Sequence, residues 1–376
     1  MKIGFDAKRA FQNTRGLGNY SRNLIYGLVD YYPENEYYLF GQPAGNGECT
    51  NWFRSLSDQV HLITPDAASA IKKALWRSFS MGRYIEENQL DIYHGLSHEI
   101  PVRKKNKLTK YVVTIHDLLF LRFKENFKWL DVQIYLSKIK YSCRNTDLIL
   151  AVSRQTKEDL INYLKVPEEK IIVCYQSCSP LYYNLLEETQ KTKIRTKYKL
   201  PADFFLFVGA LVEHKNIERI IEAMAILPKE IKLPLIIVGR TTRYKEKLLE
   251  KIKKLNLVKR IIFLDYVDHE DMPALYQLAK IMIWPSLFEG FGIPIIEALF
   301  SGLPVITSKG GCFPEAGGPS TCYIDPLQPE EIAAAVQKIV TDEALYLKMK
   351  HNGYEYVSRF NLSNTTNDLM NIYSSI

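Results

Sequence analysis

Two glutamates in one apolar segment are the residues whose types and spacing point most directly to chemistry. The segment 285–297 reads Pro-Ser-Leu-Phe-Glu-Gly-Phe-Gly-Ile-Pro-Ile-Ile-Glu, with Glu289 in a glycine-containing loop and Glu297 eight residues later. Two such carboxylates could accept hydrogen bonds from two hydroxylated parts of one ligand, each worth about 1.5–3 kcal/mol. A structural alternative makes Glu289 a helix-end residue and Glu297 an ion-paired one, but buried carboxylates need partners and the neighbours here are apolar.

The backbone between these glutamates is suited to binding an anion. Pro294 fits the first turn of a helix, where its missing N–H costs nothing. The N–H groups around Phe291, Gly292 and Ile293 would then be free to donate to phosphate or sugar oxygens.

A lysine follows the strand expected at Phe204–Val208. Lys215 lies in the polar loop 209–216, directly before the helix expected at Ile217–Leu227. Beside a helix N-terminus it is a candidate partner for a diphosphate. Taken alone, the residue is better explained as one of many surface lysines.

Two glycines in the first half precede another expected helix. Gly16 and Gly18 would allow a tight turn and a close approach of a ligand to the backbone. A dinucleotide fingerprint would also need glycine at position 21, where this chain has Ser21. A plain turn is therefore an equal alternative to a phosphate site.

A titratable pair, His116 and Asp117, follows the strand expected at Tyr111–Ile115. Ligands of α/β folds lie at the carboxyl ends of strands, and a histidine there could act as a hydrogen-bond partner or a proton shuttle. The alternative is a histidine satisfied by local backbone, with Asp117 capping the segment that follows.

Short buried strands that alternate with helices must position these residues. In the first half, apolar runs predict strands at Lys2–Phe5, Tyr37–Phe40, Val60–Ile63, Asp91–Tyr93, Tyr111–Ile115, Leu148–Val152 and Ile171–Val173. In the second half, they predict strands at Phe204–Val208, Leu235–Val238, Ile261–Leu264, Ile281–Trp284, Val305–Thr307 and Cys322–Ile324. Helical patterns between them include Asn19–Asp30, Ser153–Leu164, Ile217–Leu227, Tyr244–Leu255 and Glu330–Val340. The alternation predicts an α/β protein with two Rossmann-like, doubly wound domains that face a cleft.

A polar, lysine-rich stretch separates the two halves. It lies within Ser177–Pro201, after the last strand of the first half and before a new apolar strand. We therefore expect an N-terminal domain at 1–180, a linker at 181–200 and a C-terminal domain at 201–361.

The composition excludes several classes of protein. The 376 residues include 49 basic and 42 acidic side chains, and 47% are apolar, which excludes a disordered chain. Six cysteines are too few for a disulfide scaffold, and Cys174 and Cys178 lack the second pair of a zinc ribbon. We expect a cytoplasmic protein with no metal site.

The excess positive charge lies mainly in the first half. Residues 1–180 hold 25 basic and 19 acidic side chains, a balance of +6 out of a total of +7. The stretch 71–79, Ile-Lys-Lys-Ala-Leu-Trp-Arg-Ser-Phe, mixes basic and large apolar residues as a membrane-surface helix would. An ordinary amphipathic helix packed on the sheet explains this stretch at least as well, and a solvated basic surface is the preferred explanation of the excess charge. We expect no nucleic-acid partner.

The segment 285–297 resembles the Glu-x7-Glu element of retaining glycosyltransferases of family 4, also called glycosyl transferases group 1. The resemblance extends over nearly the whole chain, because further short elements follow in the family's order. These elements are Gly16-Leu17-Gly18, His116-Asp117, Ser153, the loop 209–216, Gly239, Tyr266-Val267 and the stretch 311–326.

This resemblance implies the GT-B architecture, with a nucleotide-sugar donor held mostly by the C-terminal domain. Lys215 would hold the diphosphate with help from the Gly18 backbone, and Glu297 would bind the ribose hydroxyls. Glu289, together with the 291–293 backbone, would bind the transferred sugar.

The resemblance also implies positions for the base and the reacting carbon. Val267 and Arg240 would line the base pocket, and His116 would contact the donor sugar near the reacting carbon. Such enzymes retain the anomeric configuration without a metal, and the chain contains no Asp-x-Asp. The family's last helix crosses back to the N-terminal domain, which would place the helix at 362–376 there.

Two residues depart from the family's pattern at the phosphate loop. His214 stands where many members have arginine before the lysine, and Ala210 stands where others have arginine after the strand. The site would then depend on Lys215 and backbone N–H groups, or on a protonated His214.

These observations predict an enzyme that transfers a hexose, with mannose from GDP-mannose as the best candidate. The acceptor would be a hydroxyl of a glycan or lipid-linked glycan in cell-surface polysaccharide synthesis. The enzyme would need no cofactor besides its donor and would act in the cytoplasm, at the inner face of the membrane if the acceptor is lipid-linked. The alternatives are a sugar-nucleotide-binding module without turnover and an NAD-dependent oxidoreductase, against which Ser21 counts.

Overall fold

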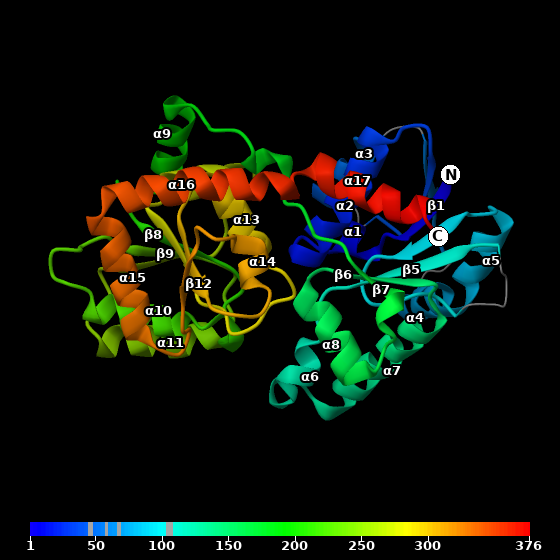
Figure 1. The fold of residues 1–376 in the computed structure, drawn as a ribbon, viewed down its shortest axis with the longest axis horizontal. Helices are drawn as coiled ribbons and strands as arrows, with labels where there is room; N and C mark the ends of the chain where they lie inside the picture. The colour runs from blue at the N-terminus through cyan, green and yellow to red at the C-terminus, as the bar shows by residue number, and fades with distance from the viewer. Residues whose placement is uncertain (44–47, 57–58, 66–68, 103–107) are drawn as a thin grey trace. The chain divides into compact units, whose positions relative to one another are not determined.

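The computed structural model of the chain describes residues 1–43, 48–56, 59–65, 69–102 and 108–376. It divides into two compact units, one formed by Met1–Cys178 with Phe360–Ile376 and the other by Ser179–Arg359. Each unit contains one all-parallel sheet with helices packed on it (Figure 1). The predicted α/β class with two Rossmann-like domains is confirmed.

The sheet of the first unit has seven parallel strands in the order β3-β2-β1-β4-β5-β6-β7. They are β1 (Lys2–Asp6), β2 (Glu36–Phe40), β3 (Val60–Ile63), β4 (Ile92–Gly95), β5 (Lys110–Ile115), β6 (Leu148–Ala151) and β7 (Ile171–Val173). The chain moves from β1 outward to β3 and returns to the other side of β1 as β4. The strand order therefore reverses between β1 and β4, which is where doubly wound sheets open a crevice for ligands.

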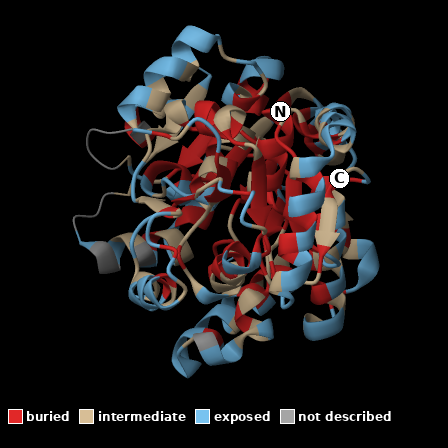
Figure 2. Ribbon diagram, turned by 90° about the vertical axis from the view of Figure 1, so that its left-hand side faces the viewer, coloured by how far each residue is buried: buried red, intermediate tan, exposed pale blue. Residues whose placement is uncertain are grey.

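Helices cover both faces of this sheet. They are α1 (Lys8–Gln12), α2 (Gly16–Tyr31), α3 (Glu48–Arg54), α4 (Ala70–Leu75), α5 (Met81–Glu87), α6 (Leu119–Arg122), α7 (Trp129–Asn145), α8 (Arg154–Leu164) and α17 (Leu362–Ser374). One core joins the sheet to α1, α2 and α17, and the other joins it to α5, α7 and α8. Strand β2 serves both, with Tyr37 and Leu39 in the first core and Tyr38 and Phe40 in the second. Figure 2 shows the buried residues gathered in the strands and the exposed ones on the outer helix faces.

The sheet of the second unit has six parallel strands in the order β10-β9-β8-β11-β12-β13. They are β8 (Phe205–Val208), β9 (Leu235–Val238), β10 (Ile261–Leu264), β11 (Ile281–Trp284), β12 (Val305–Ser308) and β13 (Cys322–Ile324). The order again reverses next to the first strand, between β8 and β11. The carboxyl ends of these two strands are thus the expected ligand edge.

The helices of the second unit include one in the segment expected to be a linker. They are α9 (Glu188–Lys197), α10 (Ile217–Ile226), α11 (Tyr244–Lys254), α12 (Met272–Leu278), α13 (Ile293–Phe300), α14 (Phe313–Gly317), α15 (Pro329–Thr341) and α16 (Glu343–Val357). Helix α9 packs on α12, and Lys197 at its end is ion-paired with Asp268 and Asp271. Residues 188–197 are therefore part of the second unit rather than a free connection.

Helix α17 returns to the first unit, where a chain of buried hydrogen bonds ties it to the sheet. Tyr373 is 2.6 Å from Nδ1 of His94, whose Nε2 is 2.7 Å from the hydroxyl of Thr114. That hydroxyl is 2.9 Å from the hydroxyl of Tyr20 in α2. Burial lowers the pKa of His94 to about 3, so the ring is neutral and its two nitrogens have opposite hydrogen-bonding roles.

Helix α2 begins three residues earlier than the sequence pattern predicts. It starts at Gly16, so Gly16 and Gly18 form its first turn rather than a loop. A Cβ on Gly18 would lie 1.6 Å from the carbonyl oxygen of Asn13, whereas a Cβ on Gly16 would meet nothing within 4 Å. The buried Arg22 fixes that segment by donating to the carbonyls of Ala10 and Asn13. Close backbone packing thus explains the glycine at 18.

The two glycines make a matched test of this packing. We expect Gly18→Ala to lower the free energy of unfolding by about 1–3 kcal/mol or more, because the Asn13 backbone must move. Gly16→Ala should leave it unchanged or raise it by up to about 1 kcal/mol, since alanine favours a helix. Urea unfolding followed by circular dichroism measures both. Equal unfolding curves for the two variants would contradict the packing explanation.

Candidate active site

The ends of β8 and β11 bring together two charged residues that lie far apart in the sequence. The Lys215 ammonium is 2.5 Å from Oε1 of Glu289, and both side chains are less than one-fifth exposed. The ammonium also lies 4.6 Å from the ring centre of Trp284, the last residue of β11. Both residues therefore lie at the reversal point of the second sheet.

Hydrogen bonds between the two loops hold this ion pair in place. Leu287 donates its N–H to the carbonyl of His214 at 2.8 Å. The Ser286 hydroxyl also donates to that carbonyl, at 3.2 Å, and it contacts the Glu289 carboxylate. His214 thus takes part through its backbone, next to Lys215.

Asn216 fixes the end of the lysine loop. It adopts a left-handed conformation, with φ of 60°, immediately before α10. Its side-chain amide donates to the carbonyls of Pro285 and Pro326 at 3.1 and 2.5 Å. Asparagine tolerates this backbone region better than most residues do. Asn216 was not among the site residues predicted from the sequence, although an asparagine directly before a helix could have indicated that it fixes the end of the loop.

The loop that follows Glu289 ends in helix α13, which begins at Ile293 with Pro294 in its first turn. Gly292 precedes the helix with φ of 127°, a conformation that strains any other residue. Within the described part of the chain, the N–H groups of Gly292 and Ile293 have no hydrogen-bond acceptor. The neighbouring Phe291 is buried. The predicted helix start is therefore present, with donors that could meet an anion.

Glu297 lies inside α13 and is held by a tyrosine from α12. The Tyr276 hydroxyl donates to Oε2 of Glu297 at 2.7 Å. Burial raises the pKa of Glu297 to about 7, although the hydrogen bond from Tyr276 acts in the opposite direction. A carboxylate that is costly to ionise gains from further hydrogen-bond donors, such as ligand hydroxyls.

The remaining predicted residues of the second unit follow β9 and β10. Gly239 directly follows β9, and a Cβ there would lie 2.0 Å from the carbonyl oxygen of Gly209, so the chain segments after β8 and β9 approach closely. Arg240 beside it is exposed, and Val267 is partly buried in the loop after β10. All three lie at the carboxyl edge of the second sheet.

In the first unit, His116 is buried and both of its ring nitrogens have partners. Nε2 is 2.9 Å from the carbonyl of Leu96, so it must carry the proton, and Nδ1 accepts from the amide of Gln176 at 2.9 Å. Burial and the neighbouring His98 lower the pKa of His116 to about 3. The imidazole is therefore neutral, and both of its partners come from other parts of the first unit.

Asp117 and the basic stretch at 71–79 also have local structural roles. The Asp117 carboxylate accepts the N–H of Leu119, the first residue of α6, at 2.9 Å. In the basic stretch, Trp76 is buried, whereas Leu75 and Phe79 are 52% and 61% exposed. The side chains at positions 71 and 74 lie outside the described residues.

Neither a metal-binding cluster nor a membrane-spanning helix is present among the described residues. No group of three or more His, Cys, Asp or Glu side chains among them could hold a metal ion. None of the helices in the described ranges combines the length and the apolar character needed to cross a bilayer.

Two protein-family models match the two units. The model "Glycosyltransferase Family 4" matches residues 15–177, and "Glycosyl transferases group 1" matches residues 189–356. The two matched segments lie one in each unit.

Curated proteins with related sequences include two mannosyltransferases of Escherichia coli. The chain is 28% identical over 285 residues to the O-antigen chain mannosyltransferase B, covering 75% of this chain and 74% of that protein. It is 26% identical over 283 residues to the serotype-specific mannosyltransferase WbdA, covering 72% of this chain and 34% of WbdA. The chain thus spans about a third of that larger relative.

A solved structure shares the fold over its full length. It is Anabaena HepE in complex with UDP and glucose, with a TM-score of 0.76, 19% identity and 100% of both chains covered. At this identity the likeness establishes the fold, which agrees with the strand orders above.

The raised pKa of Glu297 predicts how pH affects stability. Between pH of about 4.5 and 7 the folded state keeps a proton that the unfolded state has lost, so raising the pH destabilises the wild-type protein. Glutamine does not titrate, so the pH does not affect Glu297→Gln through this position. The stability of this variant relative to wild type should therefore rise over that interval by at most about 3 kcal/mol. Urea unfolding at several pH values measures the difference. The exposed Glu250→Gln is the control, and parallel curves for wild type and Glu297→Gln would contradict the burial effect.

Proposed function

The chain belongs to the glycosyl transferases group 1, with a family 4 N-terminal domain, and we propose that this glycosyltransferase moves a hexose from a nucleoside-diphosphate sugar to a glycan hydroxyl. Mannose is the best candidate for the hexose, and GDP-mannose for the donor. Support comes from the two mannosyltransferase relatives and from the Glu-His-Lys-Asn loop at 213–216, which resembles the corresponding loop of mannosyltransferase-like members.

The ion pair of Lys215 and Glu289 at the reversal point of the second sheet carries this proposal. A diphosphate carries more negative charge than one carboxylate, so it would replace Glu289 as the partner of Lys215. The released carboxylate could then accept hydrogen bonds from hydroxyls of the transferred sugar. Donor binding would thus separate the pair into a diphosphate contact and a sugar contact.

The departing diphosphate would gain negative charge as the glycosidic bond breaks. Lys215 and the N–H groups of Gly292 and Ile293 would stabilise that charge, because they are fixed before the reaction begins. The acceptor hydroxyl would attack from the same face as the leaving group, which retains the anomeric configuration. This proposal assigns no step to a metal ion.

Glu297 would bind the ribose hydroxyls of the donor. Hydroxyls that donate to its carboxylate favour the ionised form, so binding would lower the raised pKa and release a proton near neutral pH. Gly239, Arg240 and Val267, at the ends of β9 and β10, would form the side of the site that meets the base.

His116 would contact the donor sugar as a hydrogen-bond acceptor rather than as a proton shuttle. Leu96 holds its Nε2 proton, so only Nδ1 could meet a ligand, and a sugar hydroxyl would have to replace the amide of Gln176 there. The backbone of Gly16 and Gly18, at the start of α2, would assist the diphosphate, and Asp117 would act only through the position of α6.

The acceptor is proposed to be a glycan or a lipid-linked glycan, in the synthesis of a cell-surface polysaccharide. The relative named for O-antigen chain synthesis supports this class. A lipid-linked acceptor would place the enzyme in the cytoplasm at the inner face of the membrane. The exposed Leu75 and Phe79, next to lysines at 72 and 73, would be the contact there.

A panel of nucleotide sugars tests the proposed activity. We expect GDP-mannose to raise the melting temperature and to release GDP slowly, as water substitutes for the acceptor. A thermal response without release of any nucleoside diphosphate would instead indicate a binding module without turnover. No thermal response and no release with any donor would contradict the transferase assignment.

Substitutions at the ion pair test its role. Glu289→Gln should keep the fold and lose most turnover, because the amide is a weaker acceptor for sugar hydroxyls. Lys215→Met should weaken GDP binding at least tenfold by removing the diphosphate's cation. Lys251→Met removes another ion-paired lysine of the same unit and should leave both unchanged. Full activity of Glu289→Gln would remove Glu289 from its proposed role.

A further inference from the structure

We propose that Asp6, Arg77 and Glu99 form a binding site for an uncharged acceptor sugar in the first unit. This inference rests on the proposed transferase function and names the residues and the ligand class of its acceptor side. The three residues lie at the reversal point of the first sheet, where doubly wound folds bind ligands.

The three residues come from different parts of the chain. Asp6 is the last residue of β1, and Glu99 lies in the loop that follows β4, the neighbouring strand. Arg77 comes from η1 (Trp76–Ser80), a π-helical turn between α4 and α5. Such turns occur often at functional sites, because the widened turn redirects a side chain.

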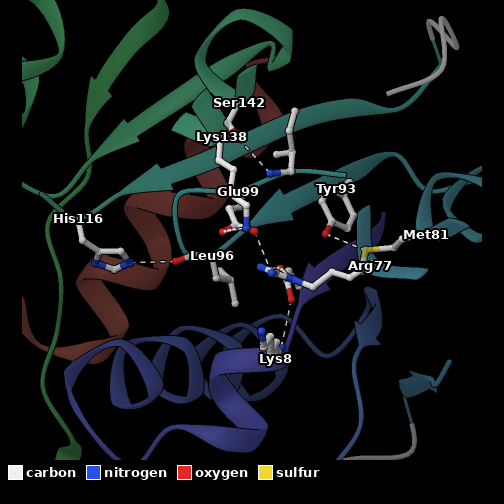
Figure 3. A network of polar contacts seen from close by, with 11 residues as sticks. Lys8, Arg77, Met81, Tyr93, Leu96, Glu99, His116, Lys138 and Ser142 are labelled. Atoms are coloured by element: carbon white, nitrogen blue, oxygen red, sulfur yellow. Dashed lines mark hydrogen bonds and ion pairs between the residues drawn. The ribbon is translucent and has the colours of Figure 1, made fainter. Parts of the chain in front are cut away.

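Arg77 bridges the two carboxylates, and Figure 3 shows its side chain pointing toward Glu99. Its Nε donates to Asp6 at 2.6 Å, and one terminal nitrogen donates to Glu99 at 2.9 Å. The other terminal nitrogen also contacts Asp6. Among the described residues, one hydrogen on each terminal nitrogen has no acceptor, so the guanidinium has donors left for a ligand.

The carboxylates also have capacity left. Glu99 receives Lys138 at 3.1 Å on its other oxygen and remains 28% exposed. Burial alone would raise the pKa of Glu99, but Arg77 and Lys138 hold it below its ordinary value. Each oxygen of Glu99 can accept a second hydrogen bond, so a sugar could meet a fixed acceptor beside a fixed donor.

The pocket at this cluster admits a hydroxyl group and excludes a sugar ring. Arg77, Ser78, Glu99 and Pro101 are among its lining residues, and its volume is about 10 Å³. That volume is about the space of one water molecule. A ligand would therefore insert one hydroxyl between the charged groups while its ring stays at the surface.

The charges of the cluster favour an uncharged ligand. Asp6 and Glu99 balance the charges of Arg77 and Lys138, their ion-pair partners, and a phosphate placed there would have to approach two carboxylates. Lys8 adds a nearby ammonium, whose pKa burial lowers. Sugar hydroxyls can donate to a carboxylate and accept from a guanidinium at the same time. The alternating donors and acceptors of this cluster match that pattern.

One loop connects the cluster to His116. Glu99 follows His98, which adopts φ of 64°, a rare conformation outside glycine and one that accumulates at functional sites. His98 accepts the backbone N–H of His116 at 3.0 Å, and Leu96 accepts from its ring. A hydroxyl held by Glu99 would thus be positioned by the same loop that fixes His116, the residue proposed to contact the donor sugar.

A comparison of acceptor and donor kinetics tests this site. The assay uses GDP-mannose with p-nitrophenyl α-D-mannoside as the acceptor, and it follows transfer and hydrolysis separately. We expect Arg77→Lys and Glu99→Gln to raise the KM for the mannoside at least tenfold. The KM for GDP-mannose and the rate of its hydrolysis should stay within twofold of wild type.

Arg122→Lys is the matched control, because Arg122 pairs with both oxygens of the buried Asp159 in the same unit but away from this cluster. It should leave the KM for the mannoside, the KM for GDP-mannose and the rate of hydrolysis unchanged. Glu99→Gln keeps the size of the side chain. If Arg77→Lys does not fold, the KM of Glu99→Gln for the mannoside tests the site.

Three results would overturn the site. They are an unchanged acceptor KM in the folded variants, the same rise in Arg122→Lys, and a wild-type enzyme that hydrolyses GDP-mannose but transfers to no mannoside. A wild-type protein that neither binds nor hydrolyses any nucleotide sugar would instead contradict the proposed transferase function itself.

Discussion

A parallel strand covered by helices on both faces has almost no place for a charged side chain, and this constraint determines where the chemistry of this protein can lie. Strands β8 and β11 read Phe-Leu-Phe-Val and Ile-Met-Ile-Trp because both of their faces are buried. Charged residues therefore lie beyond the ends of these strands, where the chain turns toward a helix. The two reversal points therefore collect the polar groups of both sheets.

The same burial requires those charges to be paired. Lys215 is ion-paired with Glu289, and Arg77 is ion-paired with two carboxylates. An unpaired charge in so buried a position would cost several kcal/mol. Under the proposed function, a ligand at the second sheet therefore replaces an internal partner. Its own charges and hydroxyls must restore the hydrogen bonds that it breaks, which makes recognition depend on chemistry at two points at once.

The strands were predictable because burial on both faces removes polar residues from them, so each appears as an apolar run. Glu289 and Glu297 were candidates because carboxylates in an apolar segment need partners, whereas Lys215 taken alone is better explained as a surface lysine. The start of α2 was predicted three residues too late because Gly16 and Gly18 weaken a helix locally. Only the structure shows that Gly18 packs against the backbone of Asn13.

The cluster around Arg77 could not be read from the sequence. Its partners lie 71 and 22 residues away, and nothing in a basic, apolar stretch distinguishes an ion-paired arginine from an exposed one. The pairing of His116 with Leu96 and Gln176 is equally non-local, so the sequence left its two interpretations open.

The two reversal points differ in how their charges are paired. At the second, one carboxylate meets one ammonium beside N–H groups of a helix start, so an anion can enter by displacing a single partner. At the first, Asp6 and Glu99 are ion-paired with Arg77 and Lys138, so the charges of these four groups balance. The net charge of residues 1–180 is +6. It cannot be taken as a sign that the first sheet binds a phosphate, because the local pairing and not the net charge sets what this edge accepts.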